Sequence, residues 1–432
     1  MIFGFGKKKD DDFEEEDEIE LISFQGPHNG ETIDLKANAK LLDAGLLPAK
    51  EIVTDAILRR ADMVRIDPKG DRSAIHLIVD GVAYPGDRLS KQEGLAVTMT
   101  MKLLAGLNIK NRTQPQSGGL NSSLEGKKYE VVVESQPLET GGERLNIKLR
   151  DLAIKLDSPA SIGIPDSIKD RLRELAGEKK GLFISAGPPR SGLTTTSLAL
   201  MKVVDVYILS VYSITDMSNR DITNVTKFDV NPNDSLETTL QRIIRVDADF
   251  VFAPPLRSVE TAKTLLEYQS QLALLTEMPA PDAASAIVQL VKLVGDPNLV
   301  ANGLKAVVSP KMIRLLCDEC KEAFRPNPKI IAKAGLPAEA KVLYRAPVAE
   351  EGEELEPCPK CGGIGYYGRS GIFEMIEIND DIKKLITSGA ANVAQIKSAA
   401  KNAGMPTFKD GGLAKVAEGK TSLEELQRLF KS

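Results

Sequence analysis

The sequence predicts an α/β protein made of several domains. Its 432 residues exceed the size of one compact core, because a domain usually contains about 100–200 residues. Short apolar runs alternate with helical segments between residues 161 and 312, a pattern typical of a parallel sheet with helices on both faces. Two Cys-x-x-Cys pairs follow this region and precede a mainly helical C-terminal part.

Composition and charge narrow the class of protein. The formal net charge is −5 and the isoelectric point is about 5.5, so the chain has no overall basic field and nucleic acid is not an expected partner. No apolar run reaches the roughly 18 residues of a membrane span, and the N-terminus lacks the pattern of a signal peptide. We therefore expect a cytoplasmic protein.

Residues 1–35 are expected to form an acidic leader without a stable fold. The first 20 residues hold too few apolar side chains to offset the entropy lost on ordering. A solvated tail and an electrostatic docking tail both fit this composition. A contact of the first residues, MIFGFGKKK, with a membrane surface is a third interpretation.

A small α+β domain is expected over residues 36–160. Helices are predicted where apolar residues recur near a 3.6-residue period, and strands where apolar and polar residues alternate. Turn signals at residues 68–71 and 80–81 predict a β-hairpin and a following tight turn. The predicted helices cover residues 38–61 and 91–107, and the predicted strands cover residues 63–66, 74–79, 128–134 and 144–149.

The α/β core is expected over residues 161–312, a cysteine-containing subdomain over 313–377 and a helical module over 378–432. A linker helix at residues 165–177 precedes the strands of the core. Those strands are short apolar runs separated by helical segments. They are predicted at residues 181–186, 206–214, 250–253 and 272–276.

The segment GPPRSGLTT, residues 187–195, has the context of a phosphate-binding P-loop, because it follows a strand and opens a helix. Backbone N–H groups of such a loop, together with the helix N-terminus, form an anion site. Thr194 stands where a hydroxyl would contact Mg²⁺, but Leu193 replaces the lysine that contacts the β- and γ-phosphates. The candidate residues for ATP and Mg²⁺ in this loop are Gly187, Ser191, Gly192, Thr194 and Thr195.

Three interpretations of the loop stay open from the residues alone. The loop is kept only as a strand–turn–helix scaffold, or it binds nucleotide weakly or with the help of a partner, or Arg190 supplies the missing positive charge. Because phosphoryl transfer depends largely on electrostatic stabilisation, each interpretation disfavours efficient hydrolysis.

The four cysteines predict a structural zinc site. Two Cys-x-x-Cys pairs in a reducing compartment favour a metal over disulfides, and tetrahedral Zn²⁺ takes four thiolates. A site with four cysteine ligands leaves no position for a reacting water, so we expect the metal to hold a subdomain together. Four free thiols are the alternative. The candidate ligands are Cys317, Cys320, Cys358 and Cys361.

Several further motifs occur in a consistent order. ADMVRIDP at residues 61–68 is similar to the pattern SDIHIEP, KLLAGLNI at 102–109 to KxxAGLDI, and PQSGG at 115–119 to PQDGR. RSGIFE at 369–374 follows the cysteines as GRTGIYE does, and DGGL and EGKTSLEE follow in the C-terminal module. The set resembles the type II secretion and type IV pilus assembly ATPases (GspE/PilB-like), over most of the chain.

This resemblance implies a RecA-like P-loop core and a tetracysteine zinc site. It also implies a hexamer at the cytoplasmic face of the inner membrane, whose ATP-driven motion is passed to an inner-membrane platform protein. It adds Arg112, Asp216 and Arg257 to the candidate nucleotide-binding residues, and Arg245 is retained as well.

Four replacements affect the motifs that carry catalysis in the family. Leu193 replaces the P-loop lysine, and Thr215 replaces the glutamate of the acidic box. Pro255 replaces the Walker B glutamate, and Pro279 replaces the histidine of the STLHTNDA box. We identify no confident catalytic residue in the core, because these groups would hold the phosphates, the metal and the attacking water.

Three functions are consistent with this pattern. The first is a catalytically degraded subunit of a secretion or pilus machine, either as a homo-oligomer or in a hetero-oligomer with an active motor ATPase. The second is an active motor with non-standard catalytic residues. The third is a nucleotide-independent binding module that reuses the fold. The missing lysine, glutamate and histidine favour the first over the second, and the motifs retained at both ends favour it over the third.

Overall fold

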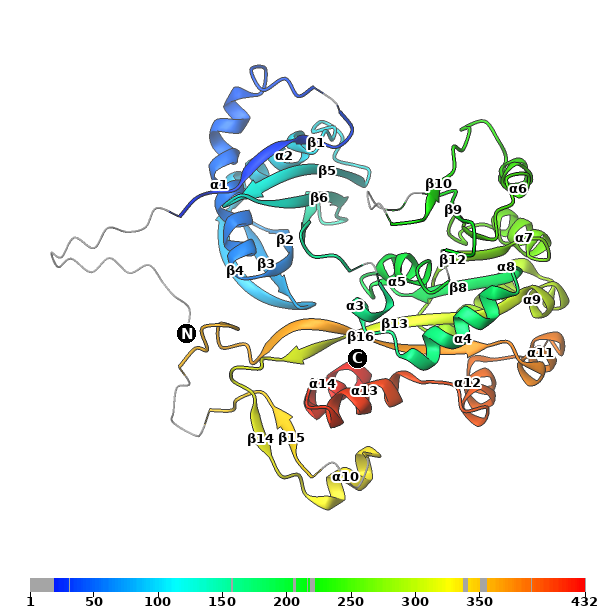
Figure 1. The fold of residues 1–432 in the computed structure, drawn as a ribbon. Helices are drawn as coiled ribbons and strands as arrows, with labels where there is room; N and C mark the ends of the chain where they lie inside the picture. Colours follow the sequence, from blue (N-terminus) through cyan, green and yellow to red (C-terminus); the bar gives the residue numbers. More distant parts are fainter. Residues whose placement is uncertain are drawn as a thin grey trace. The chain divides into compact units, whose positions relative to one another are not determined.

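The computed structural model describes residues 19–30, 32–156, 158–204, 207–215, 217, 222–336, 341–349, 356–389 and 391–431. The chain divides into two compact units, Met1–Ile154 and Lys155–Ser432, and each has its own sheet (Figure 1). The boundary lies close to the predicted one at residue 160. No helix among the described residues has the length and apolar character that a membrane crossing requires.

The N-terminal unit is built on a seven-stranded antiparallel sheet with the order β1-β5-β6-β7-β2-β3-β4. The predicted hairpin is confirmed, because β2 and β3 pair from Ala61↔Val79 to Lys69↔Arg72. The strands are β1 (Ser23–Pro27), β2 (Ala61–Lys69), β3 (Arg72–Val79), β4 (Val82–Ser90), β5 (Gln116–Leu124), β6 (Lys127–Pro137) and β7 (Glu143–Asp151).

Two helices pack against this sheet and against each other: α1 (Ala39–Leu58) and α2 (Lys91–Leu104). Their apolar side chains are buried, as the 3.6-residue period predicts; Val53 of α1 and Met101 of α2 are examples. Ser90 and Glu93 form a reciprocal capping box that begins α2. Both predicted helices are therefore confirmed.

Part of the predicted leader is ordered. Residues 1–18 and 31 lie outside the described residues, so the acidic block itself is not tested. Strand β1, however, pairs antiparallel with β5, and Ile22 just before it is fully buried. The backbone N–H of Ile22 also donates to Thr54 Oγ1 at 3.0 Å. The expectation of disorder through residue 35 is wrong for this strand, because apolar side chains return after residue 20.

The C-terminal unit contains a second seven-stranded sheet, with the order β10-β9-β11-β12-β8-β13-β16. All neighbouring strands are parallel except β13 and β16, which are antiparallel. The parallel sheet of the prediction is thus confirmed, with an antiparallel strand at one edge. The strands are β8 (Gly181–Gly187), β9 (Val211–Ser213), β10 (Thr226–Lys227), β11 (Phe250–Phe252), β12 (Ala273–Pro279), β13 (Leu304–Leu316) and β16 (Tyr366–Glu377).

Helices cover both faces of the second sheet, as predicted. Successive residues of β12 point to opposite faces, so Leu275 joins one core with α4 and α5, and Leu274 joins the other with α6 to α9, α11 and α12. The helices are α3 (Pro159–Ile162), α4 (Asp166–Gly177), α5 (Leu193–Leu200), α6 (Leu236–Ile244), α7 (Val259–Tyr268), α8 (Ala283–Val294), α9 (Pro297–Gly303), α11 (Asp380–Thr387) and α12 (Val393–Asn402).

One predicted strand is shorter than expected. The apolar run at residues 206–214 contributes only β9, Val211–Ser213. Residues 205 and 206 lie outside the described residues, and residues 207–210 form a turn in which Tyr207 and Ile208 are exposed. Apolar composition alone did not distinguish the strand from the turn before it.

The cysteine region lies at the end of the antiparallel pair β13 and β16. Cys317 follows β13 directly, and Cys361 lies just before β16. A small sheet of β14 (Glu322–Phe324) and β15 (Leu343–Arg345) and the helix α10 (Pro328–Ala334) lie between the two cysteine pairs in the chain. Helices α13 (Phe408–Ala417) and α14 (Leu423–Lys431) pack into the same apolar cluster as Ile313 and Ile372 of these strands.

Candidate functional site

The P-loop has the predicted strand–loop–helix geometry. Strand β8 ends at Gly187 and α5 begins at Leu193, so residues 188–192 form the loop. Gly192 is the N-cap of α5 and has φ of 85°, a left-handed conformation that glycine adopts readily. Arg190 is exposed and also left-handed, with φ of 69°. All five loop candidates from the sequence therefore lie together at one strand end.

The loop has few free N–H donors for an anion. Pro188 and Pro189 have no backbone N–H, and the Ser191 N–H donates to the Pro188 carbonyl oxygen at 3.1 Å. Positions 188, 189 and 191 of the loop therefore offer no free backbone N–H to an anion. Ser191 is buried, and its hydroxyl has no hydrogen-bond partner among the described residues. The anion site is therefore poorer in donors than its glycine spacing suggests.

The positions at which the resemblance implies a lost catalytic group gather at the same edge of the sheet. Pro279 at the end of β12 is in register with Gly187, and the Ala280 N–H donates to the Gly187 carbonyl oxygen at 3.3 Å. Pro254 and Pro255 follow β11, and Thr276 Oγ1 donates to the Pro254 carbonyl oxygen at 2.6 Å. Because β8, β11 and β12 are adjacent parallel strands, their carboxyl ends bring these residues beside the P-loop.

Two further candidates belong to this unit. Arg257 is exposed in the turn after β11, and its charge acts on Glu277 of β12. Thr215, at the place of the acidic-box glutamate, bonds locally: its carbonyl oxygen accepts from Ser213 Oγ at 2.9 Å. Asp216 lies outside the described residues, so its predicted role is not tested.

Glu277 is an acidic residue of this region that the sequence argument did not single out. Burial raises the pKa of the Glu277 carboxyl, whereas hydrogen bonds from Ser197 and Thr194 and the charge of Arg257 lower it. Its Oε1 atom is buried without a hydrogen-bond partner among the described residues. The available signal was a glutamate within an otherwise apolar strand, ALLTEMP.

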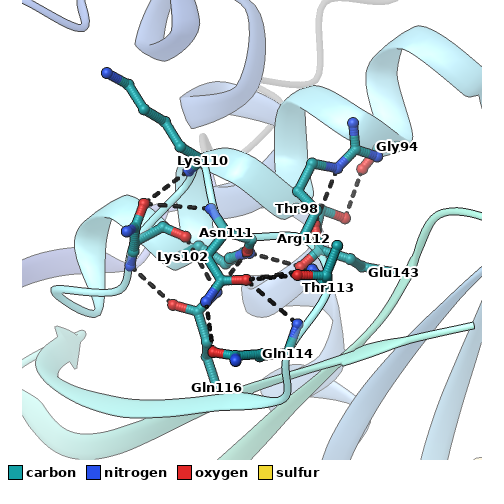
Figure 2. A network of polar contacts seen from close by, with 11 residues as sticks. Gly94, Thr98, Lys102, Lys110, Asn111, Arg112, Thr113, Gln114, Gln116 and Glu143 are labelled. Atoms are coloured by element: carbon teal, nitrogen blue, oxygen red, sulfur yellow. Dashed lines mark hydrogen bonds and ion pairs between the residues drawn. The ribbon is translucent and has the colours of Figure 1, made fainter.

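Arg112 lies in the N-terminal unit, within a polar network (Figure 2). Its Nε is 3.3 Å from Glu143 Oε2, and the other carboxylate oxygen of Glu143 accepts from Lys102 Nζ at 2.6 Å. Lys102 also donates to the carbonyl oxygen of Asn111 at 2.8 Å. The side chains of Lys102 and Glu143 are buried, whereas Arg112 is about half exposed. The observed role of Arg112 is to help neutralise Glu143.

The four cysteines form a cluster that can hold a metal ion. All four Sγ atoms lie within 4.8 Å of one another, and the pairs Cys317–Cys358 and Cys320–Cys361 have Sγ–Sγ distances of 3.9 and 3.7 Å. A tetrahedron with Zn–S bonds of about 2.3 Å requires Sγ–Sγ distances of about 3.8 Å. The geometry therefore fits zinc.

Backbone groups around the cysteines support anionic sulfur. The Gly365 N–H donates to Cys361 Sγ at 3.3 Å, and the backbone N–H of Cys361 lowers the pKa of the Cys358 thiol to about 7. Burial raises the pKa of Cys320 and of Cys361, as expected for thiols that lack a counter-charge. Lys360 joins the two cysteine turns through an ion pair with Asp318 at 2.7 Å.

Comparison with known proteins places these features in a family. A model of the family described as "Type II/IV secretion system protein" matches residues 44–428. The type IV pilus assembly ATPase PilB of Thermus thermophilus is 28% identical over 385 residues, which are 87% of this chain but 42% of that protein. The type II secretion system ATPase E of Vibrio cholerae is 28% identical over 424 residues, covering 96% of this chain and 80% of the relative.

A solved structure shows the same fold. The ATPase DotB of Yersinia pseudotuberculosis aligns with a TM-score of 0.54 at 12% identity, over 96% of this chain and 99% of that chain. At this identity the likeness concerns the fold alone. The family model covers residues 44–428, from within the first helix to within the last. The chain therefore belongs to the Type II/IV secretion system protein family.

Proposed function

We propose that this chain is a subunit of a type II secretion or type IV pilus assembly machine that keeps the fold of the motor ATPase without its efficient hydrolysis. One observation carries the proposal. Three residues stand in place of the lysine, the Walker B glutamate and the histidine: Leu193 begins the helix after the P-loop, Pro255 follows β11, and Pro279 ends the neighbouring strand β12, in register with Gly187. Loss of these catalytic groups at one site would abolish hydrolysis, whereas the hydrophobic core around the site is intact.

The remaining parts of the proposal concern assembly. We propose a cytoplasmic oligomer, a hexamer or a mixed ring with an active motor ATPase, that acts at the inner membrane with a platform protein. The support is membership in the family and the match across both units of the chain. We also propose that zinc occupies the cysteine cluster and holds the ends of β13 and β16 together.

An active motor with non-standard residues is the second candidate. Glu277 favours it, because the Thr194 hydroxyl lowers the pKa of this carboxyl, and an acidic group near that hydroxyl can serve a metal ion. Two features weigh against it. No lysine follows Gly192, and the proline at 255 cannot supply the carboxylate that positions a water molecule.

Reconstitution with an active motor ATPase of a type II secretion or type IV pilus system tests the proposal. The mixed sample should contain complexes with both chains by native mass spectrometry, and phosphate release should be proportional to the motor chains alone. A motor variant that cannot oligomerise is the control, because it should form no mixed complex. Absence of any mixed complex, together with phosphate release by this chain alone, would contradict the proposal.

A further inference from the structure

Glu277 points from the sheet toward the P-loop helix. Side chains along a strand alternate between faces, and Ala273 and Leu275 of β12 both belong to the core on the side of α4 and α5. Glu277 follows Leu275 by two residues, so its side chain faces the same side. Helix α5 packs against β12 there. On this face of β12, an acidic side chain therefore follows two apolar, buried side chains.

Hydroxyl groups of the first turns of α5 meet this carboxylate. Thr194 and Ser197 are three residues apart, a spacing that puts them on one face of a helix, and the hydroxyls of both lower the pKa of the Glu277 carboxyl. The Ser197 hydroxyl donates to the carbonyl oxygen of Leu193 at 3.1 Å. Ser185 is fully buried beside Glu277 in the strand register, and its hydroxyl has no hydrogen-bond partner among the described residues.

We propose that the carboxylate of Glu277 is a negative charge belonging to the P-loop site itself, and that it prevents nucleoside triphosphates from binding there. Thr194 is the hydroxyl that a P-loop offers to the metal of a bound nucleotide, and here it is near enough to the Glu277 carboxyl to lower the pKa of that group. Leu193 adds no positive charge to offset a second anion. A triphosphate in the loop would meet a like charge in a half-buried site, where repulsion is poorly screened.

This inference rests on the proposed function and deepens it, because it explains loss of ligand binding in addition to loss of hydrolysis. It makes Glu277 a residue that determines whether the site accepts a ligand. The opposite role, in which Glu277 holds Mg²⁺ for a nucleotide, uses the same contacts but predicts the opposite effect of removing the charge.

The test is a titration of Mg·ATP into the zinc-replete full chain, followed by calorimetry. Glu277→Gln keeps the shape of the side chain and removes its charge. We expect it to bind Mg·ATP at least about tenfold more tightly than the wild type, because a repulsive charge is removed. Glu267→Gln is the matched control: Glu267 is an exposed residue of α7, and this change alters the net charge equally.

A second variant protects the test against a folding defect. Glu277→Thr suits a strand and should also raise the affinity, and both variants should keep the wild-type circular dichroism spectrum and zinc content. Equal affinities in the wild type and both variants, or no binding in any of them, would overturn the inference. Weaker Mg·ATP binding in Glu277→Gln would overturn it in favour of a metal-holding role. ATP turnover by the wild type would instead refute the proposed function.

Discussion

At the scale of single residues, the candidate site is recognised by residues that stand in place of the expected catalytic groups. Most of these replacements could be identified from the sequence. Leu193, Pro255 and Pro279 could each be identified by comparison with a motif, because they occupy fixed places beside glycines or apolar runs. Glu277 could not, since its meaning depends on which face of β12 it occupies and on the hydroxyls of α5 across from it. Those relations require the strand register, which periodicity alone does not supply.

Glu374 is a second buried carboxylate with an unusual proton affinity. It lies on β16, and its Oε1 accepts the backbone N–H of Ala283, at the start of α8, at 2.7 Å. The pKa of Glu374 is raised to about 7: burial and the nearby charge of Asp282 raise it, and they outweigh the N–H of Ala283 and the charges of Lys397 and Lys311, which lower it. The folded chain therefore binds a proton near neutral pH that the unfolded chain has already lost.

The raised pKa of Glu374 predicts that the free energy of unfolding falls as the pH rises. The pKa of Glu374 is raised from 4.5 to about 7 on folding, so its stabilising contribution is complete below pH 4.5 and is lost as the pH rises toward 7. Glu374→Gln imitates the protonated form. Relative to the wild type, it should gain about 2–3 kcal/mol of unfolding free energy between pH 5 and pH 7.5.

Urea denaturation of both proteins across this pH range measures the difference. Glu377→Gln is not a suitable control, because Glu377 pairs with Arg171. Glu267→Gln is suitable, since Glu267 is exposed and should show no change in relative stability with pH. A pH-independent difference between Glu374→Gln and the wild type would refute the assignment of this proton.

At the scale of elements, strands with an apolar–polar alternation or a short apolar run were predicted, whereas β4 and β5 were not. Strand β5, QSGGLNSSL, contains two glycines and several small polar residues, and β4, VAYPGDRLS, contains a Pro-Gly pair. Both have low intrinsic strand propensity and form because their neighbours β6 and β3 offer complete pairing partners. The antiparallel direction of β16 also could not be read from the sequence, because it follows from the return of the chain through the cysteine region.

The buried ion pair of the N-terminal unit predicts an asymmetric cost of mutation. Lys102→Met would leave the Glu143 carboxylate buried with only the half-exposed Arg112 as a counter-charge, so it should cost about 3–5 kcal/mol of stability. The double variant Lys102→Met/Glu143→Leu should recover a large part of that loss, because no uncompensated carboxylate remains. Urea denaturation followed by circular dichroism measures both. Equal losses in the single and double variants would contradict this view of the network.

The cysteine cluster predicts a metal-dependent element. Purified protein should contain one zinc ion per chain by elemental analysis, and Cys317→Ser should lose zinc and lower the thermal midpoint, because the binding energy of a structural metal contributes to folding. Glu356→Gln, two residues before Cys358 and exposed, is the matched control and should keep both properties. Wild-type protein without stoichiometric zinc, purified without chelator, would show that the four sulfurs form no zinc site.

At the scale of the whole molecule, the order of the parts could be predicted from the sequence, but the elements that share each core could not. The boundary between an α+β unit and an α/β unit was placed close to the observed one at Ile154. The cysteine-containing subdomain and the helical module expected beyond residue 312 belong to the C-terminal unit: α11 and α12 complete the main core, and α13 and α14 join the cluster around β13 and β16. Composition marks changes of local structure, but only packing decides which elements share a core.

The rate of ATP hydrolysis by the purified, zinc-replete chain tests the central claim most directly. The replacements Leu193, Pro255 and Pro279 remove charge, water positioning and the histidine together, so the account predicts no phosphate release above that of a Thr194→Ala variant at saturating Mg·ATP. That variant identifies any contaminating activity, because Thr194 belongs to the candidate site. Turnover of about 1–10 s⁻¹, in the range of ordinary enzymes, that Thr194→Ala abolishes would contradict the account.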